Sequence, residues 1–268
     1  MTIEAVSLSQ EVLQVIARYD ALRLHTYRDS ESLHSRIRIE TLGASTLLRF
    51  DDVGYFNRIY AADTSILSRL DEVERFYAGC PFVCELVASE VELAAACART
   101  CERRGWTRGR TYSWMAAAVE QLIAPPAPSE FAIRRAEPGE EELFFTAYLS
   151  GFEADRNRFP EAVRNMRHLF QHDCLSFHLA TVEGVSAGIG MTYADGQDMV
   201  FCAGATVPEF RNRGCHHALL AARVQLARSS NVRHVYGWCE TNGVSERNML
   251  QAGMENVGAI TAWMYSSI

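Results

Sequence analysis

The segment Thr206–His217 combines residue types that can hold an anion. It reads TVPEFRNRGCHH and joins a strand-like run, 198–207, to a run with apolar residues at helical spacing. The first amides of a helix have no partner within the helix, and the helix dipole is positive at that end. Gly214 lets the backbone approach a ligand closely, and Arg211 and Arg213 add fork-shaped donors. A pyrophosphate suits such a turn, and an ordinary surface turn with two solvated arginines is the alternative.

Two cysteine pairs and a histidine pair have spacings that invite a metal-site hypothesis. They are Cys80 with Cys84, Cys97 with Cys101, and His168 with His172 near Cys174. Cysteine is among the residue types most often buried in a core, and a His pair one turn apart without the Glu of H-E-x-x-H is a weak zinc signal. The sequence therefore predicts no metal, and it predicts reduced thiols because the length does not suit a disulfide scaffold.

Composition excludes several function classes. The chain has 268 residues and no lysine, so all 26 of its basic residues are arginine. This excludes Schiff-base lysine chemistry and any phosphate site that depends on a P-loop or kinase lysine. The net charge of −7 argues against nucleic acid or an anionic membrane as a partner. No apolar run approaches the roughly 18 residues that span a bilayer, which favours a cytoplasmic protein.

A proline-rich connector divides the elements that must position these residues. Residues 124–130, APPAPSE, hold three of the 7 prolines. Beyond it the pattern predicts strands at 131–136, 177–182, 185–191, 198–207, 234–239 and 259–265. Helices are expected after Pro138, after Pro160, from Cys215 and over 244–252. This order favours a mixed α/β sheet.

The first half repeats the end of that order. Its predicted strands are 46–50, 55–61, 82–87 and 111–117, with helices over 65–77 and 91–104. In both halves a helix ends in glycine followed by a bulky apolar residue, at Gly105-Trp106 and Gly253-Met254. This predicts a duplication, although many α/β domains contain such a step. The first half has only AADTS, at 61–65, where the second half has its arginine-rich turn.

In these features the second half resembles the GNAT acetyltransferase superfamily over about residues 131–268. The family signature [Q/R]-x-x-G-x-[G/A] is answered by RNRGCH at 211–216. Its downstream pattern is answered by Asn242, Ser245, Met249 and Gly253. The resemblance implies an α/β fold with two tandem acyl-CoA N-acyltransferase-like domains, each with a mostly antiparallel sheet flanked by helices.

The resemblance also implies acetyl-CoA, or another acyl-CoA, as co-substrate. The residues it assigns to this cofactor are Ala205, Thr206, Val207, Arg211, Asn212, Arg213, Gly214, Cys215, His216, His217, Asn242 and Asn248. Backbone groups near Ala205 and Val207 would pair with the pantetheine arm, the main chain of 213–217, helped by Arg211, would hold the pyrophosphate, and the two asparagines would contact the pantetheine amides.

Three departures from the family pattern bear on catalysis. His216 stands where Gly or Ala is usual, and Met249 replaces the tyrosine that often protonates the leaving thiolate. No acid lies within 199–207, where a general base is often found. Glu240, directly after the strand 234–239, is the preferred base, against the alternative of a solvated loop carboxylate. Ser245 could donate to the thiolate, or could simply belong to the helix start.

We expect an enzyme that moves an acetyl or similar short acyl group from acyl-CoA to the amine of a small molecule. The expected domains are a degenerate one at 1–123, the linker 124–130, and an acetyl-CoA-binding one at 131–268. The alternative is a non-catalytic acyl-CoA-binding or scaffold protein on the same fold. A thiol hydrolase using Cys202 or Cys239 is a more distant alternative, because neither has a visible His-Asp partner. Nothing in the sequence indicates the oligomeric state.

Overall fold

The chain divides into two compact units in a computed structural model that describes residues 3–29, 33–88 and 91–267. The first unit comprises residues 1–115, 238–246 and 256–268, and the second comprises 116–237 and 247–255. Each unit is thus built from separate stretches of the sequence. This division by packing differs from the boundaries expected from the linker, because the last strand of the chain belongs to the first unit. The assignment of domains to 1–123 and 131–268 stays a prediction.

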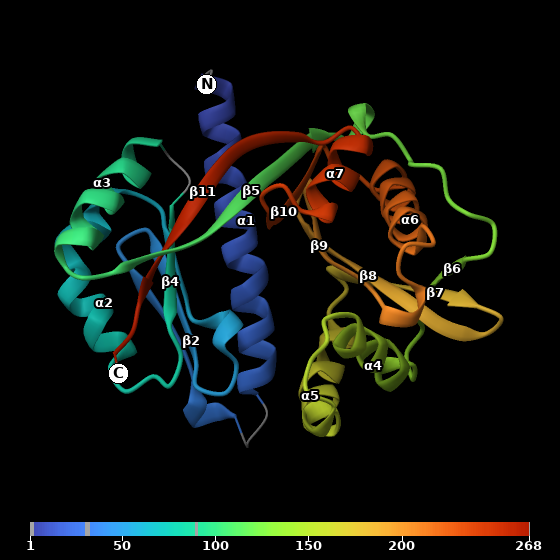
Figure 1. Ribbon diagram of the computed structural model, residues 1–268, viewed down its shortest axis with the longest axis horizontal. Coiled ribbons are helices and arrows are strands. Elements are labelled where there is room, and N and C mark those ends of the chain that lie inside the picture. The colour runs from blue at the N-terminus through green and yellow to red at the C-terminus, as the bar shows by residue number, and fades with distance from the viewer. Residues whose placement is uncertain (1–2, 30–32, 89–90, 268) are drawn as a thin grey trace. The chain divides into compact units, whose positions relative to one another are not determined.

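Helices and strands alternate along most of the chain (Figure 1). The α-helices are α1 (Ile3–Arg28), α2 (Leu70–Tyr77), α3 (Val91–Arg103), α4 (Glu141–Gly151), α5 (Phe159–Met166), α6 (Cys215–Ser229) and α7 (Val244–Gln251). The strands are β1 (Ile37–Leu42), β2 (Ser45–Phe50), β3 (Arg58–Ala61), β4 (Cys84–Ala88), β5 (Thr107–Ala118), β6 (Ala132–Arg135), β7 (Leu175–Val182), β8 (Val185–Asp195), β9 (Asp198–Thr206), β10 (His234–Glu240) and β11 (Glu255–Tyr265). No helix within the described residues is both long and apolar enough to cross a bilayer.

The sheet of the first unit has the strand order β1-β2-β3-β4-β11-β5. Strands β1, β2 and β3 are antiparallel, and β3 and β4 are parallel. β11 then pairs antiparallel with β4, which places Trp263 opposite Leu86. The end of the chain therefore completes the sheet that its beginning started.

Helices cover both faces of this sheet. Ile59 and Ala61 of β3 lie in an apolar core with residues of α2 and α3, whereas the hydroxyl of Tyr60 donates to Asp20 of α1 at 2.5 Å. Successive strand residues point to opposite faces. Figure 1 accordingly shows α1 on one side of these strands and α2 and α3 on the other.

The cysteine pairs of the first half lie in the same core. Cys80, Cys84, Cys97 and Cys101 are all buried there, as the general tendency of cysteine to lie in a core predicted. Burial raises the pKa of Cys97 and of Cys101 to about 12, so these thiols stay protonated. None of the eight cysteines, all of which lie within the described residues, forms a disulfide. Among the described residues no group of three or more His, Cys, Asp or Glu side chains has an arrangement that could hold a metal ion.

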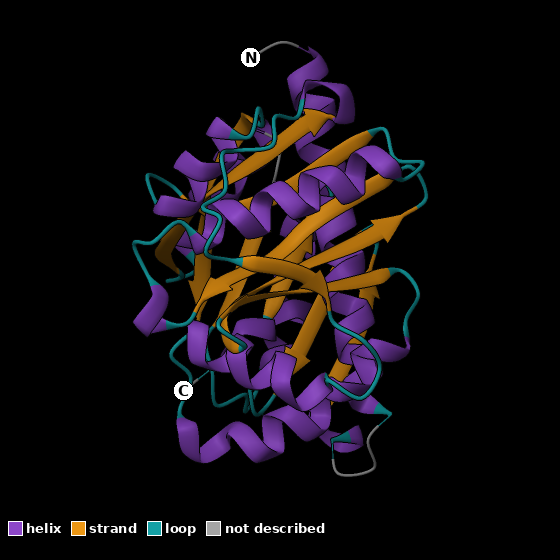
Figure 2. Cartoon of the chain, turned by 90° about the vertical axis from the view of Figure 1, so that its right-hand side faces the viewer, coloured by secondary structure: helices purple, strands orange, loops and turns teal. Residues whose placement is uncertain are grey.

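The second unit repeats the pattern of antiparallel strands followed by a parallel pair. Strands β6 to β9 are antiparallel, and β9 pairs parallel with β10 through three residue pairs. A Cβ on Gly204 would lie against Arg223 of α6, and Gly151 of α4 lies against Ala205. Because residues 204 and 205 point to opposite faces, α4 and α6 cover opposite faces of this sheet. The strands lie between layers of helix (Figure 2).

Local turn chemistry agrees with the sequence. Glu183 and Gly184 both have positive φ in the β7–β8 hairpin, as its turn requires. Gly105 and Gly253 have φ of 80° and 82°, and the amides of the next residues, Trp106 and Met254, return to carbonyls of the preceding helix at 3.0 and 3.1 Å. The helix–glycine–strand step is therefore present in both halves, as predicted.

Other predictions for the first half need correction. Helix α1 and strand β1 were not predicted. The predicted strand 55–61 is shortened to β3, because Gly54–Phe56 form a 3₁₀ turn. The predicted helix 65–77 begins as a 3₁₀ helix over Thr64–Arg69 before α2.

Candidate functional site

The predicted anion loop lies between β9 and α6. β9 ends at Thr206, a 3₁₀ turn covers Pro208–Phe210, and α6 begins at Cys215. Asn212 and Gly214 both have left-handed backbones, with φ of 60° and 86°. A left-handed residue reverses the chain sharply, and glycine adopts this conformation without the cost that a Cβ adds. The loop thus delivers the chain directly into the helix start.

The first amides of α6 are available to a ligand. Within the described residues the amides of Cys215, His216 and His217 have no hydrogen-bond acceptor, and no side chain caps the helix. The first bond into the helix start is from the amide of Ala218 to the carbonyl of Gly214, at 3.1 Å. Unpaired amides at the positive end of a 15-residue helix form an anion site.

Both loop arginines are paired with carboxylates. Arg211 forms an ion pair with Glu153 and also donates to the carbonyl of Gly151 at 3.0 Å. Arg213 forms an ion pair with Glu130, at the end of the proline-rich connector. This neighbouring carboxylate raises the pKa of Arg213. The two guanidinium groups are half-exposed, so their present partners can be exchanged for those of a ligand.

The proline-rich connector contacts the loop at Gly214. A Cβ added to this glycine would lie 2.6 Å from Cγ of Pro128, which is closer than real contacts allow. Gly214 therefore has two reasons to be glycine, its positive φ and this close approach. Two residues of the connector, Pro128 and Glu130, thus border the loop on one side.

His216 does not project into the loop as its family position suggested. Its Nε2 lies 3.2 Å from where a Cβ of Gly204 would be, beneath α6, and its Nδ1 lies 3.0 Å from Nδ2 of Asn248. Burial, with the nearby charges of Arg223 and His217, lowers the pKa of His216 to about 3. The ring is therefore neutral and directed inward, and only its amide faces the loop region.

Asn248 joins the two histidines. Its Oδ1 lies 3.0 Å from Nε2 of His217, and its Nδ2 contacts His216. Both polar ends of the buried amide are thus engaged within the protein. The assignment of Asn248 to a pantetheine contact stays a prediction, and the structure gives it a positioning role at the helix start.

Arg223 is a buried cation that the sequence reasoning missed. It is 1% exposed, donates to the carbonyls of Ala203 and Leu219 at 3.2 and 3.3 Å, and lies over Gly190 and Gly204. Burial lowers its pKa to about 10. The glycines on adjacent strands provide the room for this side chain. They are the last residues of GIG, 188–190, and of CAG, 202–204, and these two runs are the sequence signal for a large side chain packed over the strands.

The free edge of β9 starts at a bulge. Phe201 and Cys202 stand opposite the single residue Thr192 of β8, and pairing with β10 ends at Val200. The amide of Val207 donates to Ala187 at 2.9 Å, and backbone groups alternate between the two edges of a strand. Of the predicted residues 205–207, Thr206 is therefore the one whose amide and carbonyl point away from β8, toward the free edge.

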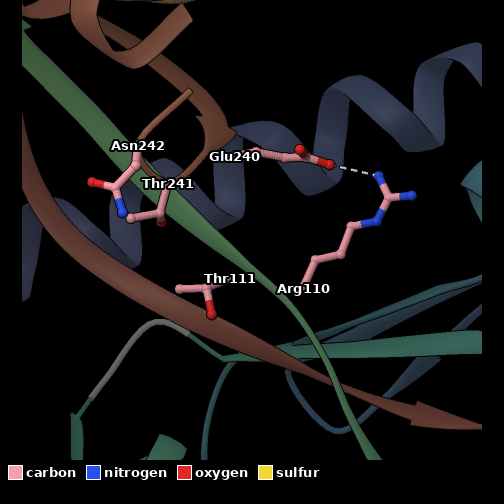
Figure 3. Close-up of a pocket in the computed structure, with 5 residues that line it drawn as sticks. All are labelled: Arg110, Thr111, Glu240, Thr241 and Asn242. Atoms are coloured by element: carbon pink, nitrogen blue, oxygen red, sulfur yellow. Dashed lines mark hydrogen bonds and ion pairs between the residues drawn. The ribbon is translucent and has the colours of Figure 1, made fainter. Parts of the chain in front are cut away.

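The remaining predicted residues lie in the first unit, where Glu240 ends β10, Asn242 lies in the turn that follows and Ser245 lies at the start of α7. Glu240 and Asn242 line a pocket of about 620 Å³ with Arg110, Thr111 and Thr241. Glu240 forms an ion pair with Arg110 at 2.6 Å, and Figure 3 shows the two charged groups facing each other. Ser245 is half-buried at the second position of α7.

Glu246, which the sequence reasoning also missed, braces this turn. Its Oε2 accepts from the amide of Asn242 at 2.5 Å, and its Oε1 accepts from Asn256 at 2.9 Å. The Ser113 hydroxyl, with these two donors, lowers the pKa of Glu246. The buried carboxylate permits Asn242 to hold a left-handed φ of 64°.

Two positions that bear on catalysis are buried. Met249 packs against Gly237 of β10, with its Cε 3.2 Å from where a Cβ would be. Burial, with the charge of Glu246, raises the pKa of Cys239 to about 12, so this thiol is a poor nucleophile at neutral pH.

The first unit closes the position that corresponds to the anion loop. Between β3 and the following helix, the carboxylate of Asp63 accepts from the amide of Ser65 at 2.8 Å. Hydrogen bonds from Ser65 lower the pKa of Asp63, so it is charged at neutral pH. A carboxylate at the helix start already caps one of its amides and repels an anion, and the absence of a phosphate loop from the first half stays a prediction.

Comparison with known proteins identifies the fold. No protein-family model matches the sequence, and no curated protein matches it. A GCN5-related N-acetyltransferase from Kribbella flavida matches with 18% identity over 92% of this chain and 94% of that one, at a TM-score of 0.63. A tandem GNAT protein from the clavulanic acid biosynthesis pathway matches with 12% identity over 99% of this chain and 95% of that one, at 0.61.

A third structure, a GCN5-related N-acetyltransferase from Sphaerobacter thermophilus, has 18% identity over 75% of this chain, at a TM-score of 0.55. This chain spans 65% of its length. The chain therefore has the GNAT acetyltransferase fold, and the match to the tandem protein extends over both halves.

Proposed function

We propose that the protein is an acyl-CoA-dependent N-acyltransferase that moves an acetyl or similar short acyl group to the amine of a small molecule. The transfer would be direct, in a ternary complex, and would take place in the cytoplasm, where thiols such as its eight free cysteines stay reduced. The observation that carries the proposal is the β9–α6 loop, with its unpaired amides and two arginines, on this fold.

The residues of the loop fit a pyrophosphate. The amides of Cys215 to His217 would bind its oxygens, and Arg211 and Arg213 would exchange their carboxylate partners for phosphate. The inward turn of His216 keeps its side chain out of the way. The outward backbone groups of Thr206 would bind the pantetheine arm as an added strand would. Acyl-CoA supplies a thioester whose acyl carbon bonds to the amine nitrogen as the carbon–sulfur bond breaks and the thiolate leaves.

Glu240 is the proposed base. Amines are protonated at neutral pH, so the ammonium of the acceptor must lose a proton before its nitrogen can attack. The half-exposed carboxylate of Glu240 would take this proton, directly or through water, inside the 620 Å³ pocket. The main source of rate would be the approximation of the two substrates.

A thermal-shift titration with acetyl-CoA, CoA and longer acyl-CoAs tests the cofactor site. At about 100 times the Kd, binding to the native state raises the melting temperature by about 5–10 °C. Gly214→Glu, with a carboxylate at the loop and a Cβ against Pro128, should abolish the shift.

Gly184→Glu is the matched control. It adds the same charge at a glycine with φ of 81° in the β7–β8 hairpin, where a Cβ would meet nothing. The control should lose some stability and keep the full ligand shift. No shift in the parent protein with any thioester, or an equal loss in both variants, would contradict the proposal.

A non-catalytic acyl-CoA-binding protein is the second candidate, and it is favoured by Met249 in place of the family tyrosine and by the lack of an acid within 199–207. With no hydroxyl at this position, residue 249 offers no acid to the leaving thiolate, although a CoA thiol can leave unassisted. Release of CoA with a panel of small amines distinguishes the two. Tight binding of acyl-CoA with no release above background for every amine would favour the binding protein.

A further inference from the structure

The pocket of the first unit is lined by polar residues, and two of them carry opposite charges. Arg110 and Thr111 belong to β5, Glu240 ends β10, and Thr241 and Asn242 follow it. The volume of about 620 Å³ is sufficient for a small metabolite. Among the described residues every side chain that lines it is polar or charged, so charge and hydrogen bonds are available to recognise a ligand.

The walls of the pocket are held in place by hydrogen bonds. The amide of Thr241 donates to the carbonyl of Thr111 at 3.2 Å, and its hydroxyl lies 2.9 Å from that of Ser113. The hydroxyl of Thr111 lies 3.0 Å from that of Thr261. Glu246 fixes the turn after Glu240 from below. A fixed frame lowers the entropy cost of binding.

The two charged side chains, in contrast, can rearrange. Arg110 and Glu240 are 69% and 61% exposed, so water screens the ion pair between them. Such a pair contributes little to stability, and it can open at small cost. Once the pair is open, the guanidinium of Arg110 can bind a carboxylate of a ligand, and the carboxylate of Glu240 can bind an ammonium.

We propose that this pocket binds small zwitterionic amino compounds, of which α-amino acids are the simplest, with their carboxylate on Arg110 and their ammonium on Glu240. In an α-amino acid the two charged groups are attached to one carbon, which suits two opposite charges as near to each other as Arg110 and Glu240, whose ion pair measures 2.6 Å. A ligand with only one charge would open the ion pair and leave one of its members without a partner. A zwitterion replaces both partners at once.

The amine of such a ligand would be the acyl acceptor, and this part of the inference rests on the proposed function. Its ammonium would lie at Glu240, the group proposed to remove its proton. The hydroxyls of Thr111 and Thr241 would then contact the polar remainder of the ligand.

Calorimetric titration of the full-length protein without any CoA tests the site. The probes are L-amino acids with small and polar side chains, their amides, which lack the carboxylate, and their N-acetyl derivatives, which lack the ammonium. We expect at least one amino acid to bind, and its amide and its N-acetyl derivative to bind at least tenfold more weakly. Arg110→Gln should bring the amino acid down to the affinity of its amide.

Arg38→Gln is the matched control. Arg38 forms an exposed pair with Glu40 at 2.9 Å in the same unit, with exposures of 47% and 54%, outside the pocket. It should leave binding unchanged. No binding of any amino acid at millimolar concentration, or equal binding of an amino acid and its amide, would overturn the proposal. Amino acid binding without an acyl-CoA thermal shift would keep this site and reject the transferase. An acyl-CoA thermal shift without binding of any amino acid would reject only this amino acid site and keep the transferase.

Discussion

The two loop arginines show how far a single residue's role depends on its partners. Arg211 and Arg213 were predicted to donate to a phosphate. In the structure Arg211 is paired with Glu153, and Arg213 is paired with Glu130. Binding of an anion must therefore separate two ion pairs. The carboxylates also reduce the positive potential at the start of α6, so they tune affinity downward.

Glu130→Gln should strengthen CoA binding. The substitution removes the negative partner of Arg213 and leaves the loop otherwise intact, so the Kd should fall by about two- to fivefold, the range of an exposed ion pair. Calorimetric titration with CoA at low salt measures it, and the gain should shrink at high salt, where charges are screened. Glu161→Gln, at an exposed position of α5, is the control for net charge alone. Weaker binding in Glu130→Gln would mean that Glu130 supports the loop.

For single residues, the sequence predicted the chemical role of a side chain better than it predicted the residue that the side chain pairs with. The residue types of RNRG already indicate an anion loop. The carboxylates that meet the arginines lie 58 and 83 residues away in the sequence, and no local pattern indicates such distant pairing. Glu240 was predicted, whereas Arg110, its partner from 130 residues away, was not.

At the scale of elements, the β10–α7 turn depends on one buried carboxylate. Glu246 holds the amide of Asn242 and the side chain of Asn256, with Ser113 as a further donor. A glutamine can offer only one oxygen where the carboxylate offers two. The turn that carries Glu240 is therefore more stable when Glu246 is ionised than when it is protonated.

Glu246→Gln should destabilise the protein by about 1–3 kcal/mol at pH 7, the cost of losing a hydrogen bond to a charged, buried acceptor. Because the folded-state pKa of Glu246 lies below its unfolded value, this stability is present above the unfolded pKa and is lost as the pH falls through the folded pKa. The difference between the variant and the parent should thus shrink from pH 7 to about pH 3.5. The midpoint of urea unfolding measures it.

Glu255→Gln, an exposed carboxylate at the start of β11, is the control and should change the midpoint little. A difference between Glu246→Gln and the parent that stays constant with pH would indicate a packing defect and contradict the role of the charge.

Most elements of the second unit could be predicted because their patterns are local. The Glu183-Gly184 turn, Gly253 and the apolar spacing of α6 each specify one conformation within a few residues. Helix α1 was missed even though Leu13, Ile16 and Leu24 of its buried face recur at helical spacing. The 3₁₀ turn at Gly54–Phe56 was missed because its aromatic residues also suit a strand.

At the scale of the whole molecule, the path of the chain is the feature that local patterns could not supply. β11 was predicted as a strand, yet its partner is β4, some 180 positions earlier. Trp263 joins the core of the first unit, and the ring of Tyr265 stacks on Trp106 at 5.1 Å. The pattern of apolar residues in a strand predicts which of its faces is buried, but it does not predict which strands pair with it.

The fragment 1–123 should therefore not fold alone. It lacks β11, which covers the edge of β4, and it lacks residues 238–246 of the same unit. We expect no cooperative thermal transition for this fragment, and recovery of one when 124–268 is co-expressed. Circular dichroism at 222 nm during heating measures both. A sharp transition of the isolated fragment would contradict the assignment of β11 to the first unit.

The position of β11 has a consequence for synthesis. A ribosome that adds about 5–20 residues per second delivers the N-terminal half first, and domains usually fold in that order. Here the first unit waits for residues 255–265, which follow its first half by a delay on the order of ten seconds. During this time β4 presents an unpaired edge, the kind of surface on which nascent chains aggregate and which chaperones shield. Expression yield should thus depend on the translation rate of the codons between β4 and β11 more than on that of the codons before β4.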